Sequence, residues 1–185
     1  YVEDVRTVVD ALPRAPVLVG HSMGGAIVQQ YLADDESSIK AAVLLASAVP
    51  GGLGTAWMLR TALRNRPRGM RAARDVTRGR PVAAADVAAT PFFGNRIDLA
   101  GARRWAALLQ PESKAAVAHL RIPYTDRYDV RLPILVLGSR ADRLFSAYDV
   151  RRTAAAYGVE AVLFDDLCHD MQLDPEWEGP ARAIL

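Results

Sequence analysis

Several features that mark specialised classes of protein are scarce or missing in this sequence. Its 185 residues include one cysteine, Cys168, which excludes a disulfide framework within the chain. The 23 basic residues nearly balance the 21 acidic ones, and a net charge of +2 provides no overall field for nucleic acid or for a membrane surface. The sequence has no run of about 18 apolar residues, the length that spans a bilayer. We therefore expect no nucleic-acid partner and no transmembrane segment, and a cytoplasmic location is the default expectation.

Histidine is also rare, since the chain has only His21, His119 and His169. Along the sequence, no group of histidine and carboxylate residues has the spacing that is typical of metal ligands. The glycine-rich stretch 20–25 lacks the lysine that a phosphate-binding loop requires. The sequence therefore predicts neither a metal ion nor a cofactor.

Apolar residues make up 51% of the chain, which is enough for a globular core. Continuous apolar runs are typical of buried parallel strands, and the amphipathic patterns between them predict helices. The expected strands are residues 17–19, 40–47, 132–138 and 160–164, and the expected helices are residues 1–12, 26–33, 147–157 and 175–185. This alternation predicts an α/β fold with a parallel sheet, flanking helices and right-handed crossovers.

The segment 53–131 has a different character. Prolines and a glycine interrupt its helical patterns, and it contains no apolar run of the core-strand type. The helical patterns lie around residues 56–63, 70–74 and 100–110. We interpret 53–131 as a helical cap or lid inserted into a core that is formed by 1–52 and 132–185.

The functional prediction starts from residues 16–28, Pro-Val-Leu-Val-Gly-His-Ser-Met-Gly-Gly-Ala-Ile-Val. A Gly-x-Ser-x-Gly pattern between a strand and a helix forms a sharp turn, which raises the Ser22 hydroxyl above the sheet and aims the helix N-terminus at the group that Ser22 attacks. We expect a Cβ atom at Gly20 or Gly24 to collide with its neighbours, and the Met23 amide to donate to an oxyanion. The alternative is a glycine-rich turn with a solvated serine.

A serine nucleophile needs a base, and the base needs an acid that orients it. His169 lies in the loop after the last expected strand, where the carboxyl ends of parallel strands meet in one crevice. His21 lies inside the turn and is expected to point elsewhere, and His119 is expected to be structural. Asp142 follows the preceding strand and gives the chain order serine, aspartate, histidine. The competing acids are Asp165, Asp166 and Asp170, which lie in the same loop as His169 and are poorly placed to receive its Nδ1–H.

The sequence resembles the α/β-hydrolases of the esterase and lipase superfamily. The resemblance rests on Gly20-His21-Ser22-Met23-Gly24-Gly25, on Gly138 followed by Asp142, and on Cys168-His169-Asp170-Met171. The first of these motifs, together with Asp174 and Trp177 after His169, is similar to monoacylglycerol-lipase-like and lysophospholipase-like members. The resemblance covers nearly the whole chain outside the cap.

The resemblance also implies a departure from the family pattern. In this superfamily the nucleophile follows about the fifth of eight strands, whereas one helix precedes it here. The chain is therefore expected to form the C-terminal part of the fold, without the early loop that gives a second oxyanion donor. The strand 17–19 would then be an exposed apolar edge, open to self-association or to pairing with a missing N-terminal half.

The resemblance implies a serine hydrolase that cleaves a carboxylic ester of a small or lipid-like substrate. Ser22, His169 and Asp142 would form the triad, with the Met23 amide at the oxyanion. The same fold also hydrolyses lactones, thioesters and C–C bonds and carries out cofactor-free oxidation. A truncated, non-catalytic binding or interaction domain is the alternative from another class.

Two features of the cap are open to a functional or a structural interpretation. Trp57, Phe92, Phe93 and Trp105 could line an acyl pocket or simply pack the cap. A group of arginines could form a basic surface for anionic lipids or acidic substrates, or a solvated face. The arginines are residues 60, 64, 66, 68, 71, 74, 78 and 80.

Overall fold

The computed structural model describes residues 1–123, 125 and 128–185. Four parallel strands form one sheet in the order β1-β2-β3-β4. The strands are β1 Val17–His21, β2 Ala41–Leu45, β3 Ile134–Ser139 and β4 Ala161–Phe164. All four apolar runs therefore form strands of the predicted parallel sheet.

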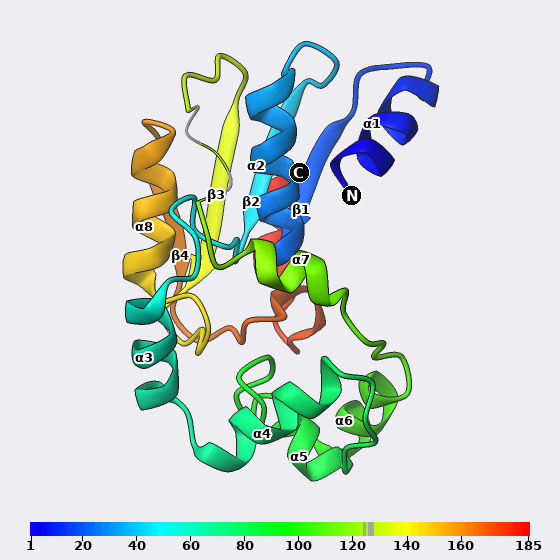
Figure 1. Ribbon diagram of the computed structural model, residues 1–185, viewed down its shortest axis with the longest axis vertical. Helices are drawn as coiled ribbons and strands as arrows, with labels where there is room; N and C mark the ends of the chain where they lie inside the picture. The colour runs from blue at the N-terminus through cyan, green and yellow to red at the C-terminus, as the bar shows by residue number, and fades with distance from the viewer. Residues whose placement is uncertain (124, 126–127) are drawn as a thin grey trace.

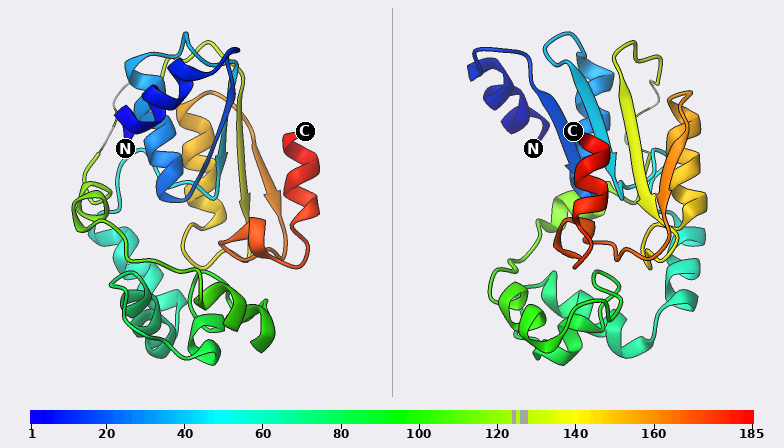
Figure 2. Two further views of the ribbon diagram at one scale, coloured as in Figure 1. Left: turned by 90° about the vertical axis from the view of Figure 1, so that its right-hand side faces the viewer. Right: turned by 180° about the vertical axis from the view of Figure 1, so that it is seen from behind.

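Helices cover both faces of the sheet, as Figure 2 shows, with α2 and α8 on one face and α9 on the other. The helices that flank the sheet are α1 Val2–Ala11, α2 Met23–Asp34, α8 Ala147–Ala156 and α9 Glu178–Ile184. A short 3₁₀ helix, Met171–Leu173, precedes α9. Gly158 follows the C-cap of α8, and its φ of +66° is the left-handed conformation that favours glycine.

The alternation of side chains along β2 creates two separate halves of the core. Ala42 and Leu44 pack with residues of α2 and α8, whereas Val43 and Leu45 pack with Met171 and the α9 side. Successive side chains of a strand point to opposite faces, so a strand that is buried on both sides must be apolar throughout. This is why β2 appears in the sequence as a continuous apolar run.

The strand β1 lies at one edge of the sheet and pairs with β2 in parallel register, from Val17 opposite Ala41 to His21 opposite Leu45. Val17 and Val19 are 48% and 51% exposed. The predicted exposed apolar edge is thus present in this structure.

The segment 53–131, which we call the insertion segment, contains five helices and no strand among its described residues. They are α3 Thr55–Arg64, α4 Pro67–Val76, α5 Ala84–Ala88, α6 Leu99–Ala106 and α7 Lys114–His119. Figure 1 shows these helices at the carboxyl ends of the strands. The sequence missed the short helices α5 and α7 and extended α6 too far.

Among the described residues, no helix is long and apolar enough to cross a membrane.

Candidate active site

The turn between β1 and α2 holds Ser22 in a strained backbone conformation, with φ 54° and ψ −116°. A non-glycine residue in this region is uncommon and persists only where its surroundings fix it. The Ser22 N–H donates to the Leu45 carbonyl at 3.1 Å, and the Ser22 carbonyl accepts from Gly25 and Ala48, each at 3.0 Å. The end of β2 and the first turn of α2 therefore lock the serine in place.

Two glycines make this turn sterically feasible. A Cβ atom on Gly20 would lie 2.5 Å from the Gly24 carbonyl oxygen, and one on Gly25 would lie 2.1 Å from Ser47 Oγ. A Cβ atom on Gly24 would meet nothing within 4 Å. The expected collision at Gly24 was therefore wrong, because Gly24 faces the open cavity described below.

Asp142 and His169 are brought together from the loops after β3 and β4. His169 Nδ1 lies 3.0 Å from Asp142 Oδ2, and their side chains are 1% and 0% exposed. The other carboxylate oxygen, Oδ1, accepts from the backbone N–H groups of Leu144 and Phe145 at 2.7 and 3.0 Å. Both oxygens of this carboxylate are thus held by hydrogen bonds. The carboxylate in turn favours the imidazole tautomer with hydrogen on Nδ1 and a lone pair on Nε2.

The competing acids do not contact His169 Nδ1. Asp165 is exposed and pairs with Arg140 at 2.9 Å, and Asp166 is also exposed. Asp170 lies instead beside His21, with its Oδ1 3.6 Å from His21 Nε2. The geometry therefore favours Asp142 as the acid that orients His169.

The electrostatics of the His169 side chain suit a base. Burial would lower the pKa of His169, but the charge and hydrogen bond of Asp142, together with Asp170, outweigh it and raise the pKa above its usual value. Burial raises the pKa of the neighbouring Cys168 thiol well above its usual range. Cys168 is therefore protonated at neutral pH, and its thiol is a poor nucleophile.

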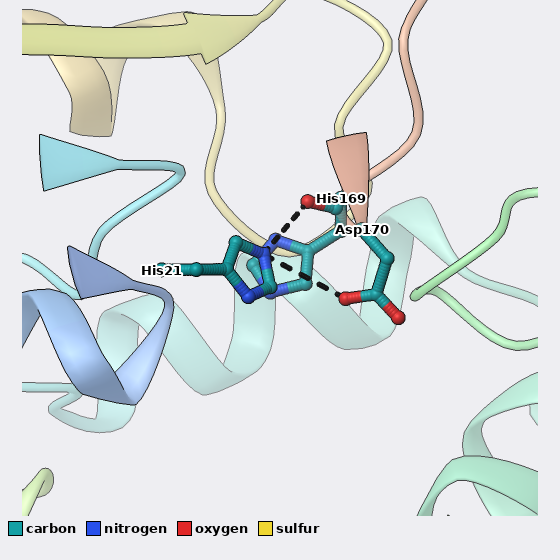
Figure 3. Close-up of side chains that lie close together, drawn as sticks. All are labelled: His21, His169 and Asp170. Carbon is teal, nitrogen blue, oxygen red and sulfur yellow. Dashed lines mark hydrogen bonds and ion pairs between the residues drawn. The ribbon is translucent and has the colours of Figure 1, made fainter. Parts of the chain in front are cut away.

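The sequence analysis predicted that His21 points away from the site, and this prediction was wrong. Its Nε2 lies 3.0 Å from the His169 carbonyl oxygen, and the two imidazole centroids are 4.8 Å apart (Figure 3). Burial, reinforced by the nearby His169, lowers the pKa of His21 to about 3, so this imidazole is neutral at neutral pH. Burial raises the pKa of Asp170 to about 6, although His169 acts in the opposite direction.

These three residues also form a group that the spacing along the sequence did not show. The ligand atoms of His21, His169 and Asp170 all lie within 4.8 Å of one another. The sequence could not show this cluster, because His21 ends β1 and the other two residues follow β4, almost 150 positions later along the chain.

A cavity of about 280 Å³ opens at Ser22 and His169. Residues from the turn, the His169 loop and the insertion segment line it. They are His21, Ser22, Met23, Gly24, Val76, Thr77, Phe92, Leu109, Gln110, Glu112, His169 and Asp170. No lysine or arginine lines the cavity among the residues that the structure describes.

One of the four candidate pocket aromatics, Phe92, lines this cavity, with its ring centroid 6.3 Å from that of His169. Phe93 is fully buried in a separate apolar cluster, against which Trp105 packs. Trp57 packs on Phe145, with ring centroids 5.6 Å apart. For Trp57, Phe93 and Trp105 the structure therefore supports the packing interpretation.

The arginines of the insertion segment lie outside the cavity, and several are paired. Arg60 binds Asp149 at 3.0 Å, Arg68 pairs with Asp86, and Arg80 pairs with Asp75 at 3.2 Å. Others, such as Arg71 and Arg78, are exposed. The arginines therefore do not form the walls of a site for an acidic substrate.

The sequence analysis did not predict which residues hold the His169 loop, although the family resemblance included Asp174. Asp174 is buried, accepts the Cys168 N–H at 2.9 Å, and is gripped by Arg96 through two hydrogen bonds of 3.1 Å. The buried Ser139 hydroxyl accepts the Leu167 N–H at 3.0 Å. No local pattern marks Arg96 or Ser139, because their partners lie far along the chain.

With this geometry established, the chain can be compared with known proteins. The model of the alpha/beta hydrolase family matches residues 1–177. The chain belongs to this family. Comparison with the curated proteins finds no similar sequence.

Solved structures of other alpha/beta hydrolases share the fold. The chain is 21% identical to E-2-(acetamidomethylene)succinate hydrolase, with a TM-score of 0.70, covering 100% of this chain and 70% of that one. It is 20% identical to a monoacylglycerol lipase from Paleococcus ferrophilus, with a TM-score of 0.63, covering 99% and 71%. It is 16% identical to a bromoperoxidase from Bacillus anthracis, with a TM-score of 0.69, covering 99% and 71%. The fold class predicted from the sequence is confirmed.

Proposed function

We propose that this alpha/beta hydrolase is a serine hydrolase that cleaves a carboxylic ester through an acyl-enzyme. The proposal rests mainly on one observation: the strained Ser22 and the Asp142-bound His169 line the same cavity. The names of the hydrolase and lipase neighbours are consistent with it.

The mechanism follows from the positions of these groups. Ser22 Oγ attacks the ester carbonyl carbon while His169 Nε2 takes its proton, and Asp142 stabilises the imidazolium. The protonated His169 then donates to the leaving alkoxide, which departs as an alcohol and leaves an ester on Ser22. Water attacks this ester, with His169 again as the base, and releases the acid. The Met23 N–H, in the first turn of α2, is the donor that the turn offers to the oxyanion.

The cavity favours a small and uncharged ester. Its volume of about 280 Å³ lies below the range of roughly 300–1,000 Å³ that is typical of drug-sized ligands. Its described lining contains Glu112 and Asp170 but no arginine or lysine, so a substrate carboxylate would find no basic side chain to pair with there. We therefore expect neutral short-chain esters to be better substrates than anionic ones. Lactone, thioester or C–C hydrolysis and cofactor-free oxidation would use the same site.

The proposal is tested by labelling the chain with a fluorophosphonate, which reacts covalently with an activated serine. We expect labelling in the wild type and in Ser37→Ala, a control at an exposed serine. Ser22→Ala and His169→Ala should not be labelled. Equal labelling of Ser22→Ala and wild type would refute the assignment.

A second candidate is a non-catalytic interaction domain, which the exposed β1 edge favours. In that case the folded chain would remain unlabelled and would associate through the edge that carries Val17 and Val19. Sedimentation analysis of the wild type, combined with the labelling experiment, separates the two candidates.

A further inference from the structure

Two histidines and an aspartate, His21, His169 and Asp170, lie close together, as Figure 3 shows. All three line the cavity. His21 is the last residue of β1, and His169 and Asp170 lie in the loop after β4. Their ligand atoms all lie within 4.8 Å of one another. In a tetrahedral zinc site with bonds of about 2.0–2.1 Å, neighbouring ligand atoms are about 3.4 Å apart. Side-chain rotations that move these ligand atoms by roughly an ångström would therefore bring all three to one ion.

Both imidazoles have a nitrogen that can bind a metal. His169 donates its Nδ1 hydrogen to Asp142, which leaves the Nε2 lone pair free. The interaction of a metal-bound imidazole with a carboxylate through its other nitrogen is the usual support for a histidine ligand. Asp142 therefore already orients His169 as it would a metal ligand.

His21 has a neighbour that would allow it to change tautomer. Its Nε2 donates to the His169 carbonyl at 3.0 Å, and its Nδ1 lies 3.4 Å from the Gln172 side-chain amide nitrogen. If the Gln172 amide turns over, its oxygen accepts hydrogen on Nδ1 and the Nε2 lone pair is released.

The charges around the cluster favour a dication. Asp170 and the buried Asp142 contribute negative charge, Glu112 lies on the cavity lining, and no basic side chain lines the cavity among the described residues. Two imidazoles and a carboxylate are a ligand set that zinc uses in proteins. The cavity gives an ion access to all three groups.

We propose that His21, His169 and Asp170 form a binding site for zinc or a similar divalent cation, which switches the site off. A bound ion would take the Nε2 lone pair of His169, so this residue could no longer accept the Ser22 proton. The ion would leave Ser22 itself unmodified, and a chelator would restore the free base. The inhibitory effect rests on the proposed hydrolase function, whereas the binding site does not.

Calorimetric titration with zinc chloride tests the binding site without any catalytic readout. We expect one zinc ion per chain for the wild type, for Ser22→Ala and for His119→Asn, the last being a control that removes an exposed histidine at the end of α7. His21→Gln and Asp170→Asn should each weaken the affinity at least tenfold. Two different ligand variants are used so that a folding defect in one leaves the other informative, and circular dichroism checks both.

A wild type without saturable zinc binding, or ligand variants that bind zinc as tightly as the wild type, would overturn the proposed site. The inhibitory effect is tested by fluorophosphonate labelling, which zinc should slow in the wild type and a chelator should restore. Unchanged labelling at saturating zinc would refute the switch. If zinc binds but the zinc-free wild type is not labelled, the hydrolase proposal fails and the metal site stands.

Discussion

Gly20 and Gly24 occupy matching positions in the Gly-x-Ser-x-Gly turn but have opposite steric surroundings. In Gly20→Ala the new Cβ would lie 2.5 and 2.7 Å from the carbonyl oxygen and carbon of Gly24, and 2.8 Å from Gly25 Cα. All three are backbone atoms, so no side-chain rotation relieves the collision. In Gly24→Ala the new methyl would meet nothing within 4 Å. We therefore expect the first variant to be damaged and the second to be tolerated.

The size of the difference can be estimated from general packing effects. Overpacking of a tight site costs about 1–3 kcal/mol, and a collision with backbone on three sides falls at the upper end, about 3 kcal/mol. Gly24 lies in the first turn of α2, where alanine is favoured over glycine by up to roughly 0.5–1 kcal/mol. For a chain of this size, 1 kcal/mol shifts Tm by about 2–4 °C. Gly20→Ala should thus lower Tm by roughly 6–12 °C, and Gly24→Ala should leave it unchanged or raise it slightly.

Urea unfolding and thermal melts, both followed by circular dichroism, measure these effects. Fluorophosphonate labelling measures in parallel whether Ser22 keeps its position, and it should drop sharply in Gly20→Ala because the collision displaces the turn itself. The reasoning would be refuted if Gly20→Ala were as stable as the wild type, or if Gly24→Ala lost as much stability as Gly20→Ala.

Three further predictions follow from contacts around the site. Asp170→Asn removes a charge that raises the pKa of His169, so this pKa should fall. Because the base must be neutral to act, the acidic limb of the kcat/KM profile for ester hydrolysis should move to lower pH. A move to higher pH would contradict this. Arg96→Ala leaves the buried Asp174 carboxylate without its cationic partner and should lower the free energy of unfolding by about 3 kcal/mol in urea, with Arg96→Lys intermediate. Equal stability of all three proteins would argue against a role of this ion pair in stability. Val19→Lys places a charge on the exposed edge of β1 and should reduce any concentration-dependent association seen by sedimentation. Association that persists unchanged would exclude this edge as the contact between chains.

The sheet could be predicted from the sequence because its signals are local. A strand that is buried on both faces must be apolar at every position, and this holds for β2 and for most of β3. The turn at Ser22 is also a local pattern. The chain order of Ser22, Asp142 and His169 was enough to predict the contact between Asp142 and His169, which is seen at 3.0 Å. The assignment of catalytic roles to these residues stays a prediction.

The features that the sequence did not reveal depend on contacts between distant segments. The pattern could not show which glycine is crowded, since Gly25 is restricted by Ser47 from another segment. It could not distinguish Phe92 at the cavity from Phe93 in the core, because the two residues are adjacent and differ only in direction. The direction of His21 was misjudged for the same reason, as its partners follow β4.

The insertion segment also holds the loop that carries Asp142. At the end of α3, Arg64 donates to the carbonyl oxygen of Asp142 at 2.5 Å. The next residue, Asn65, donates to the carbonyl of Arg143 at 3.0 Å. These two contacts hold the backbone at Asp142 and at the residue that follows it, so the position of the Asp142 carboxylate depends on α3 as well as on β3.

The loop that carries His169 is held by a second part of the insertion segment. The Asp170 N–H donates to the carbonyl of Phe92 at 3.1 Å, and Arg96 grips Asp174. An insertion segment that swung open as a whole would break these contacts and release His169 from its position. In the proposed hydrolase, we therefore expect substrate entry to leave these anchors in place and to involve the cavity-lining parts of the segment, at Val76 and at residues 109, 110 and 112. Access to the cavity and assembly of the site would then be independent, and the site could remain assembled through each turnover.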